Sequence, residues 1–176
     1  MDKKTKIFFS ADQHFGQKTA ISYFTRPFKN VNCMDNTLID NWNKVVRSCD
    51  VVYHLGDFVN EEATKEEINY YLNSLNGRIV FIYGNHDNKL LKVSERFENI
   101  YSRKTILVGK QKIILRHKAL SNWKNKNIVW HLHGHSHGNL PKRAKGIKIC
   151  DVGVECWNYK PVTMRQLKRK LGKFVV

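Results

Sequence analysis

Three short apolar segments in the first half of the chain each run directly into side chains that commonly bind metal ions. The segments are residues 6–10, 51–55 and 78–83, and each has the length of a buried strand. The side chains that follow them are Asp12 and His14, then Asp57, then Asn85, His86 and Asp87. Open α/β sheets bind their ligands at the carboxyl ends of the strands. Three such groups in succession therefore indicate one shared site, whereas any one alone is weak evidence.

The stretches between these strands carry apolar residues at helical spacing. Asp35 is expected to cap a first helix, and the capping box Thr64-Lys65-Glu66-Glu67 is expected to open a second, which Asn76-Gly77 ends. The segment that ends at Arg26-Pro27-Phe28-Lys29 is expected to be a loop with aromatic anchors. The apolar helix faces are expected to pack in the core: Leu38, Ile39, Trp42, Val45 and Val46, then Ile68, Tyr71, Leu72 and Leu75. Strands that alternate with helices predict α/β layers.

The second half of the chain is richer in predicted strands. Residues 104–108 and 111–115 are expected to form a hairpin across a turn at Gly109-Lys110, which delivers Arg116 and His117 at its end. Two further strand segments and a short basic helix are expected at residues 128–130, 147–154 and 163–170, in that order. The hairpin therefore brings another imidazole to a strand end.

The segment His131–Gly138 contains four of the eight histidines of the chain, at alternating positions. Imidazoles this close repel one another once they are protonated, and a shared cation is the simplest reason to gather them. Gly134 and Gly138 allow sharp turns, which would present His135 and His137 from a loop at a strand end. Such a loop cannot complete a metal site alone, so the strand ends must supply the remaining ligands.

Three other histidines have a simpler interpretation. His54 lies inside an apolar segment and is expected to be packed or hydrogen-bonded. His131 and His133 precede the histidine loop and are interpreted as buried strand residues, with support of the metal ligands as the alternative.

The 176 residues suit one domain, expected to span residues 1–176. Lys+Arg number 31 and Asp+Glu number 15, which gives a net charge of +16. Such a balance attracts polyanions such as nucleic acid, but a lysine-rich surface that only aids solubility explains it equally well.

The sequence also predicts where the protein works. The first residues are too short to be a signal peptide, and no apolar run approaches the roughly 20 residues of a membrane span. The four cysteines form no CxxC pair: Cys33, Cys49, Cys150 and Cys156. They are expected to be reduced thiols of a cytoplasmic protein without a membrane or a disulfide-linked partner.

Together the blocks resemble the calcineurin-like metallophosphoesterase superfamily. The matching blocks stand in the family's order: Asp12-x-His14, Gly56-Asp57, Gly84-Asn85-His86-Asp87, His117, and Gly134-His135-Ser136-His137. Flanking features resemble a subgroup of small bacterial and phage phosphoesterases: Arg26-Pro27-Phe28, Trp42-Asn43, and Asp151-Val152-Gly153-Val154 followed by Trp157 and Pro161. The resemblance implies a single-domain, four-layer α/β/β/α sandwich of two mixed sheets.

The resemblance also implies a site with two divalent metal ions. Asp12, His14 and His137 would hold one ion, and Asn85, His117 and His135 the other, as the family pattern places them. Asp57 would bridge both ions, and a hydroxide shared between them would attack phosphorus in line. Mixed oxygen and imidazole donors favour manganese but also suit iron, zinc or nickel.

His86 stands at the position that the family credits with protonating the leaving group or stabilising the transition state. Asp87 beside it is a second catalytic candidate, which would orient or polarise His86. The alternative for Asp87 is a helix cap, and both roles are compatible.

Several positions depart from the family pattern. Asp57 is followed by Phe58-Val59-Asn60-Glu61, without the arginine of protein phosphatases, and the third block ends in Asp87 rather than glutamate. Gln17 replaces a histidine that the subgroup often has, which puts any role there in doubt. Arg116 and Lys118 flank His117, where they would either contact a substrate phosphate or be merely solvated. The first two departures favour phosphodiesterase-like members.

Three functional hypotheses follow. The first is a metal-dependent phosphodiesterase on nucleotides or another small organophosphate. The second is a nuclease acting on DNA or RNA, which the net charge and the basic stretch Lys168-Arg169-Lys170 favour but the lack of an additional DNA-positioning domain disfavours. The third, a non-catalytic metal-binding scaffold, is disfavoured because every expected ligand is present. The sequence does not predict an oligomeric state.

Overall fold

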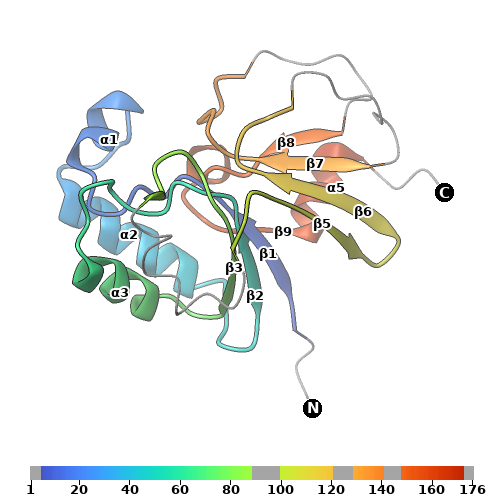
Figure 1. The fold of residues 1–176 in the computed structure, drawn as a ribbon, viewed down its shortest axis with the longest axis horizontal. Coiled ribbons are helices and arrows are strands. Elements are labelled where there is room, and N and C mark those ends of the chain that lie inside the picture. The colour runs from blue at the N-terminus through green and yellow to red at the C-terminus, as the bar shows by residue number, and fades with distance from the viewer. Residues whose placement is uncertain (1–4, 89–99, 121–128, 141–147, 173–176) are drawn as a thin grey trace.

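The computed structural model describes residues 5–88, 100–120, 129–140 and 148–172, and in them the chain forms two sheets and several helices (Figure 1). The first sheet contains β1 (Ile7–Ser10), β2 (Val51–His54), β3 (Arg78–Ile82), β4 (Ile100–Tyr101) and β9 (Val162–Thr163). The second contains β5 (Arg103–Val108), β6 (Gln111–Arg116), β7 (Trp130–His133) and β8 (Ile149–Asp151). The helices are α1 (Lys18–Tyr23), α2 (Val31–Asn43), α3 (Lys65–Ser74), the 3-10 helix η2 (Val154–Trp157) and α5 (Met164–Leu171).

Both sheets are mixed. The first has the order β4-β3-β2-β1-β9, in which only the β1–β9 pair is antiparallel. The second has the order β5-β6-β7-β8, in which only the predicted β5–β6 hairpin is antiparallel. The parallel strands β1, β2 and β3 therefore end at the same edge of their sheet, as the sequence predicts.

Alternating side chains of the first sheet pack in two separate cores. One face of the sheet packs against α2 and α3, whose predicted apolar residues Leu38, Trp42 and Ile68 are buried there. The other face packs against the second sheet, with Leu167 and Leu171 of α5 in the same cluster. Figure 1 shows α1, α2 and α3 together on one side of the first sheet and the second sheet on the other. The predicted α/β sandwich of two mixed sheets in a single domain is confirmed.

Two local predictions in the first half are wrong. The segment before Arg26 was expected to be a loop, yet Lys18–Tyr23 form α1, a helix without a side-chain cap and too short to show a periodic pattern. Asp35 does not cap α2; Asn30 does, because its side chain accepts the Cys33 amide and starts the helix one turn earlier. The capping box of Thr64 with Glu67 is confirmed at the start of α3.

The predicted strand 147–154 is too long. It forms β8 only over Ile149–Asp151, because the Asp151 carboxylate accepts the amide of Gly153 at 2.7 Å and turns the chain toward η2. The predicted strand 128–130 is only partly described, since residues 121–128 and 141–147 lie outside the described part. Among the described residues, no helix is long and apolar enough to cross a membrane.

Asp35 instead joins α2 to α3 and to the loop after β1. Its carboxylate accepts the hydroxyl of Tyr71 at 2.8 Å and the amide of Gly16 at 3.1 and 3.2 Å. Burial raises the pKa of Asp35, although these hydrogen bonds act in the opposite direction. A polar side chain on the inner face of α2 thus fixes the chain two residues beyond His14.

Replacing Tyr71 by phenylalanine should lower the free energy of unfolding by about 1.5 kcal/mol, the lower end for a hydrogen bond to a charged group. Tyr71→Phe keeps the ring that stacks on Phe15 and removes only the hydroxyl. The measurement is urea-induced unfolding. The matched control is Tyr70→Phe, whose side chain is 59% exposed, with an expected change within about 0.5 kcal/mol. Equal stability of the two variants would contradict the assignment.

Candidate metal centre

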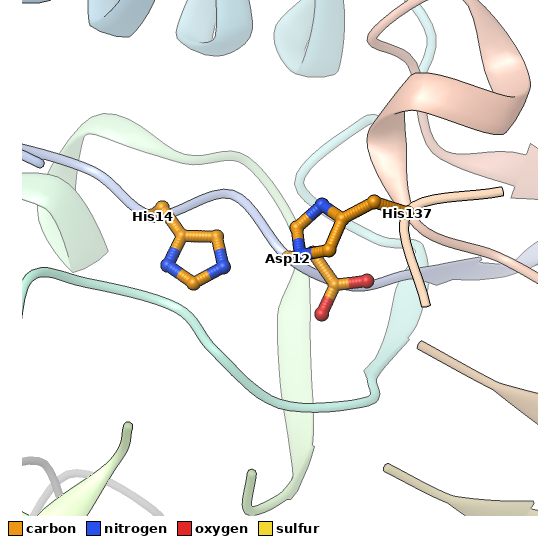
Figure 2. Close-up of side chains that lie close together, drawn as sticks. All are labelled: Asp12, His14 and His137. Carbon is orange, nitrogen blue, oxygen red and sulfur yellow. The ribbon is translucent and has the colours of Figure 1, made fainter. Parts of the chain in front are cut away.

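The loops that follow the strands are hydrogen-bonded to one another at one edge of the molecule. The His14 amide donates to the Asp57 carbonyl at 3.1 Å, and the Gly134 amide donates to the His117 carbonyl at 2.9 Å. These contacts gather six of the seven predicted ligands into two groups, in each of which one donor atom per residue lies within 4.8 Å of the others. The groups are Asp12, His14 and His137 (Figure 2), and Asp57, His117 and His135.

Five of the seven predicted ligands have a positive φ, a conformation that costs a non-glycine residue roughly 1 kcal/mol or more. Their φ values are 62° for Asp12, 52° for His14, 56° for Asp57, 67° for His135 and 45° for His137. Only three other non-glycine residues of the described part share this feature: Thr25, Asn158 and Tyr159. Backbone strain of this kind persists where the surrounding structure imposes it, and such strain concentrates at functional sites.

The two ring nitrogens of His14 have contrasting surroundings. Nδ1 lies 2.7 Å from Oε1 of Gln17, an amide oxygen that only accepts, so Nδ1 carries the hydrogen and Nε2 the lone pair. Nε2 is buried without a hydrogen-bond partner and lies 3.8 Å from Oδ2 of Asp57. Burial lowers the pKa of His14 to about 3, which keeps the ring in the neutral form that binds metal. Gln17 therefore orients a predicted ligand.

Asp12 is fully buried with a weakly satisfied carboxylate. Within the described residues both of its oxygens accept only one amide, that of His135, at 3.0 and 2.9 Å. Burial and the nearby Asp151 raise the pKa of Asp12 well above its ordinary value. A cation beside this carboxylate would offset both effects.

Arg26 fixes the backbone of the Asp12 loop through hydrogen bonds. It is 4% exposed, and its guanidinium donates to the backbone carbonyls of Asp12 at 2.6 Å and Gln13 at 2.8 Å. It also forms an ion pair with Glu155 at 2.6 Å, and Oε1 of Glu155 lies 3.0 Å from Nδ1 of His137. Burial would raise the pKa of Glu155, but His137 and Arg26 together hold it below its ordinary value. One buried arginine thus links two predicted ligands of the first group.

The second group brings three acceptors to one point. Nδ1 of His117 lies 2.7 Å from the carbonyl of Leu55, so in the neutral ring Nε2 carries the lone pair. That Nε2 lies 3.2 Å from Oδ2 of Asp57 and 3.1 Å from Oδ1 of Asn85, both of which are acceptors. With the neutral ring and this orientation of the Asn85 amide, a cation among the three acceptors, either a proton or a metal ion, would stabilise the arrangement. Asn85, the seventh predicted ligand, thereby joins this group.

Asp57 lies between the two groups. Its Oδ2 is 3.8 Å from Nε2 of His14 and 3.2 Å from Nε2 of His117. Burial would raise the pKa of Asp57, but the neighbouring imidazoles hold it well below its ordinary value. This carboxylate is therefore ionised and reaches both groups at once, which is the arrangement that a bridging ligand requires.

Two glycines leave room for these carboxylates. A Cβ at Gly84 would overlap Oδ1 of Asp57, and a Cβ at Gly134 would lie 2.6 Å from Cβ of Ala11 and 2.8 Å from Oδ2 of Asp12. Any side chain at either position would displace a predicted ligand.

The Asp87 carboxylate fastens two ligand loops together. Its Oδ2 accepts the amides of Asp57 at 2.8 Å and Gly84 at 2.6 Å, and its Oδ1 accepts the amide of Phe58 at 2.9 Å. These contacts give Asp87 a structural role that the sequence did not indicate. Orientation of His86 by Asp87 stays a prediction, and residues 89–99 beyond it lie outside the described part.

His86 lies at the open side of the site. Its amide donates to Oδ1 of Asp57 at 3.1 Å, its Nε2 lies 4.0 Å from Oδ2 of that residue, and its side chain is 35% exposed. Nδ1 of His86 contacts the carboxylate of Glu61, a residue that the sequence identified only by its departure from the family pattern. The ring is therefore held between a predicted bridging ligand and an acid at the surface.

Asp151 fixes the loop that carries His135 and His137. Its Oδ2 accepts the hydroxyl of Ser136 at 2.9 Å and the amide of Gly138 at 3.0 Å. The sequence quoted Asp151 only as a flanking feature, because nothing local indicates its partners.

The remaining histidines near the site are buried, as predicted. His54 stacks on Phe81 and contacts Oε1 of Gln13, and burial lowers its pKa to about 3. His131 accepts the Leu120 amide at 3.1 Å, and Nδ1 of His133 lies 2.8 Å from the Gly134 carbonyl. Since Gly134 precedes His135, His133 also supports the ligand loop.

The donor set fits divalent metal ions. An ionised carboxylate lies between two groups that combine carboxylate, amide and imidazole donors, and the unpartnered Nε2 of His14 faces this centre. Such mixed sets bind first-row divalent ions. The residues present therefore fit two such ions.

The fold and the site define the class of protein: the chain belongs to the calcineurin-like phosphoesterase superfamily, whose family model matches residues 6–165. An uncharacterized protein of Methanocaldococcus jannaschii is 38% identical over 96% of this chain and 92% of its own. A solved structure of a protein of unknown function from Aquifex aeolicus is similar with a TM-score of 0.73 and 25% identity, over 95% of this chain and all of that one. Neither of these names assigns an activity.

The two groups make a prediction about metal content. The wild type should bind two Mn²⁺ per chain, and His14→Ala or His117→Ala should each bind one, because each removes an imidazole from a different group. The measurement is plasma mass spectrometry of metal-loaded, gel-filtered protein, with circular dichroism to confirm folding. The control is His86→Ala, which removes a histidine that is not a predicted ligand and should retain two ions. His131→Ala is unsuitable as a control because His131 is buried. Two ions in His14→Ala would contradict the assignment.

Proposed function

We propose that the protein is a metal-dependent phosphodiesterase that acts on nucleotides or another small organophosphate. The observation that carries the proposal is the Asp57 carboxylate, which lies 3.8 Å from Nε2 of His14 and 3.2 Å from Nε2 of His117, one imidazole from each metal-binding group. In the proposal Asp12, His14 and His137 hold one ion, Asn85, His117 and His135 hold the other, and Asp57 bridges them. Manganese is the favoured metal, with iron, zinc or nickel as alternatives.

The two ions, when bound, would activate a water molecule and neutralise charge on the phosphoryl oxygens. The chain's own residues do the remaining work. The imidazole of His86 gives a proton to the leaving oxygen, a role supported by its place at the open side, 4.0 Å from the proposed bridging carboxylate. Asp87 keeps the loops of Asp57 and Gly84 in register through its three backbone contacts.

The diester preference rests on the departures from the family pattern. The residues after Asp57 lack the arginine of protein phosphatases, and Glu61 among them contacts His86 instead. A nuclease activity is the second candidate, favoured by the net charge of +16 and by three cations that line a pocket beside Asn85. We also propose a reducing, cytoplasmic location, which the four free cysteines support.

The decisive assay compares bis(p-nitrophenyl) phosphate with p-nitrophenyl phosphate, using chelator-stripped protein supplied in turn with Mn²⁺, Ni²⁺, Zn²⁺ or Mg²⁺. We expect metal-dependent cleavage with preference for the diester. Asp57→Asn should abolish activity and weaken metal binding, while His86→Ala should keep both ions and lose roughly a hundredfold or more in kcat, as expected for a lost proton donor. Preference for the monoester would favour a phosphatase. A His86→Ala protein that loses its ions would contradict the role of His86, and inactivity with every metal would favour the scaffold hypothesis.

Glu61 should act as a positioning residue for His86. Glu61→Gln should lower kcat by about tenfold, part of the roughly hundredfold or greater contribution of a positioned proton donor, with KM and metal content unchanged. Steady-state kinetics on the diester separates kcat from KM, and Glu61→Asp should restore part of the loss. Glu66→Gln, an exposed acid in the first turn of α3, is the control. A matching loss in that control would assign the effect to general charge instead.

A further inference from the structure

A pocket of about 480 Å³ opens beside the second metal-binding group. Asn85 and His117, two proposed metal ligands, form part of its wall. Three cationic side chains also line it, those of Arg103, Arg116 and Lys118. The pocket is therefore continuous with the place where the proposed function puts the phosphoester that is cleaved.

The two arginines lie directly opposite each other in the sheet. Arg103 of β5 pairs with Arg116 of β6 in the antiparallel register, so their side chains emerge on the same face as neighbours. Like charges in directly opposed positions destabilise a sheet. Neither guanidinium, nor the ammonium of Lys118, forms an ion pair with an acid in the part of the chain that the structure describes.

An anionic ligand would offset the repulsion among these three exposed cations. A guanidinium binds a phosphate through two parallel hydrogen bonds. Two opposed guanidiniums and an ammonium together carry more positive charge than a single phosphate neutralises. Elsewhere in the structure arginines near acids are paired: Arg26 binds Glu155 and Arg47 binds Asp50. The cations of the pocket, which pair with no acid among the described residues, thus differ from the arginines that stabilise the fold.

We propose that this pocket is a subsite for a second phosphate group of the substrate, held next to the phosphodiester that the metal centre cleaves. The inference rests on the proposed function and narrows it to substrates of one class, nucleotides in which a further phosphate lies close to the scissile one. Tyr83, 38% exposed, lines the same pocket and offers an aromatic face on which a nucleobase stacks. Successive phosphates of a nucleic-acid strand and neighbouring phosphates of a polyphosphorylated nucleotide share this chemistry.

The test uses two substrates that differ only in the second phosphate. Thymidine 5′-(p-nitrophenyl phosphate) is compared with the same ester carrying a 3′-phosphate, and released p-nitrophenol reports cleavage of the 5′ ester alone. We expect the wild type to prefer the 3′-phosphorylated ester by about tenfold in kcat/KM, the order of effect of one charged hydrogen bond. Arg103→Gln and Arg116→Gln should each bring the ratio of the two rates close to one. A preference that these variants leave unchanged would overturn the proposal.

Arg169→Gln is the matched control. It removes the same charge from an exposed position on α5, so it should leave the ratio as in the wild type if the pocket, rather than net charge, sets the preference. A loss of preference in this control equal to that in Arg116→Gln would also overturn the subsite. Inhibition of ester cleavage then distinguishes a nucleic-acid strand from a polyphosphorylated nucleotide as the source of the second phosphate. A short single-stranded oligonucleotide is compared with ADP, and the compound that fits the pocket should inhibit at the lower concentration.

Failure of the subsite is distinguishable from failure of the proposed function. If bis(p-nitrophenyl) phosphate is cleaved but the two thymidine esters react equally, the subsite is wrong and the phosphodiesterase stands. If no ester is cleaved, isothermal titration calorimetry of the Mn²⁺-loaded protein tests the subsite by binding alone. It compares the affinity for thymidine 3′,5′-bisphosphate with the affinity for thymidine 5′-monophosphate. Tighter binding of the bisphosphate that Arg116→Gln removes supports the subsite, and equal affinities overturn it.

Discussion

Asp57 and the lone pairs that surround it impose the constraint on which the site depends. The carboxylate lies 3.8 Å from Nε2 of His14 and 3.2 Å from Nε2 of His117, and Nδ1 of each ring faces an acceptor, Oε1 of Gln17 or the Leu55 carbonyl. Acceptors so arranged repel one another unless a cation lies among them. The arrangement therefore favours a cation beside Asp57, either a proton on an imidazole or a metal ion, and a divalent ion would contact both groups at once.

The acids near the candidate site fall into two kinds according to their hydrogen bonds. Asp87 accepts three backbone amides, and Asp151 accepts two amides and a hydroxyl, so the conformation of the loops satisfies both carboxylates. Asp12 and Asp57 each accept a single amide within the described residues and otherwise face imidazoles. Hydrogen bonding thus separates the acids that hold loops in place from the two acids proposed to bind metal ions.

The sequence predicted the strand ends and the ligand types because both follow from local patterns. Apolar runs followed by polar residues identify parallel strands and the edge at which they meet. Partners distant in the chain leave no such pattern, and the buried pair of Arg26 with Glu155 joins residues 129 positions apart. Asp35 shows the opposite error: its residue type suits a helix cap, but its carboxylate serves the hydroxyl of Tyr71, a contact made only once α2 and α3 pack. Positive φ at the predicted ligand positions is likewise a tertiary effect, imposed by loops that hydrogen-bond to one another.

The net charge and the cationic pocket act at different distances, so they have different effects on an anionic ligand. A charge of +16 attracts any polyanion and recognises no particular ligand. At physiological ionic strength, salt screens the attraction between exposed charges over a distance of about 8 Å. The opposed Arg103 and Arg116 act at contact distance and in one orientation, next to Asn85 and His117. Net charge would therefore set how often an anionic substrate arrives, whereas the proposed subsite would set which substrate stays long enough to react. A basic surface alone is compatible with many functions, whereas a basic pocket that shares its wall with the candidate metal centre is the more specific feature, and the proposal of a second phosphate rests on it.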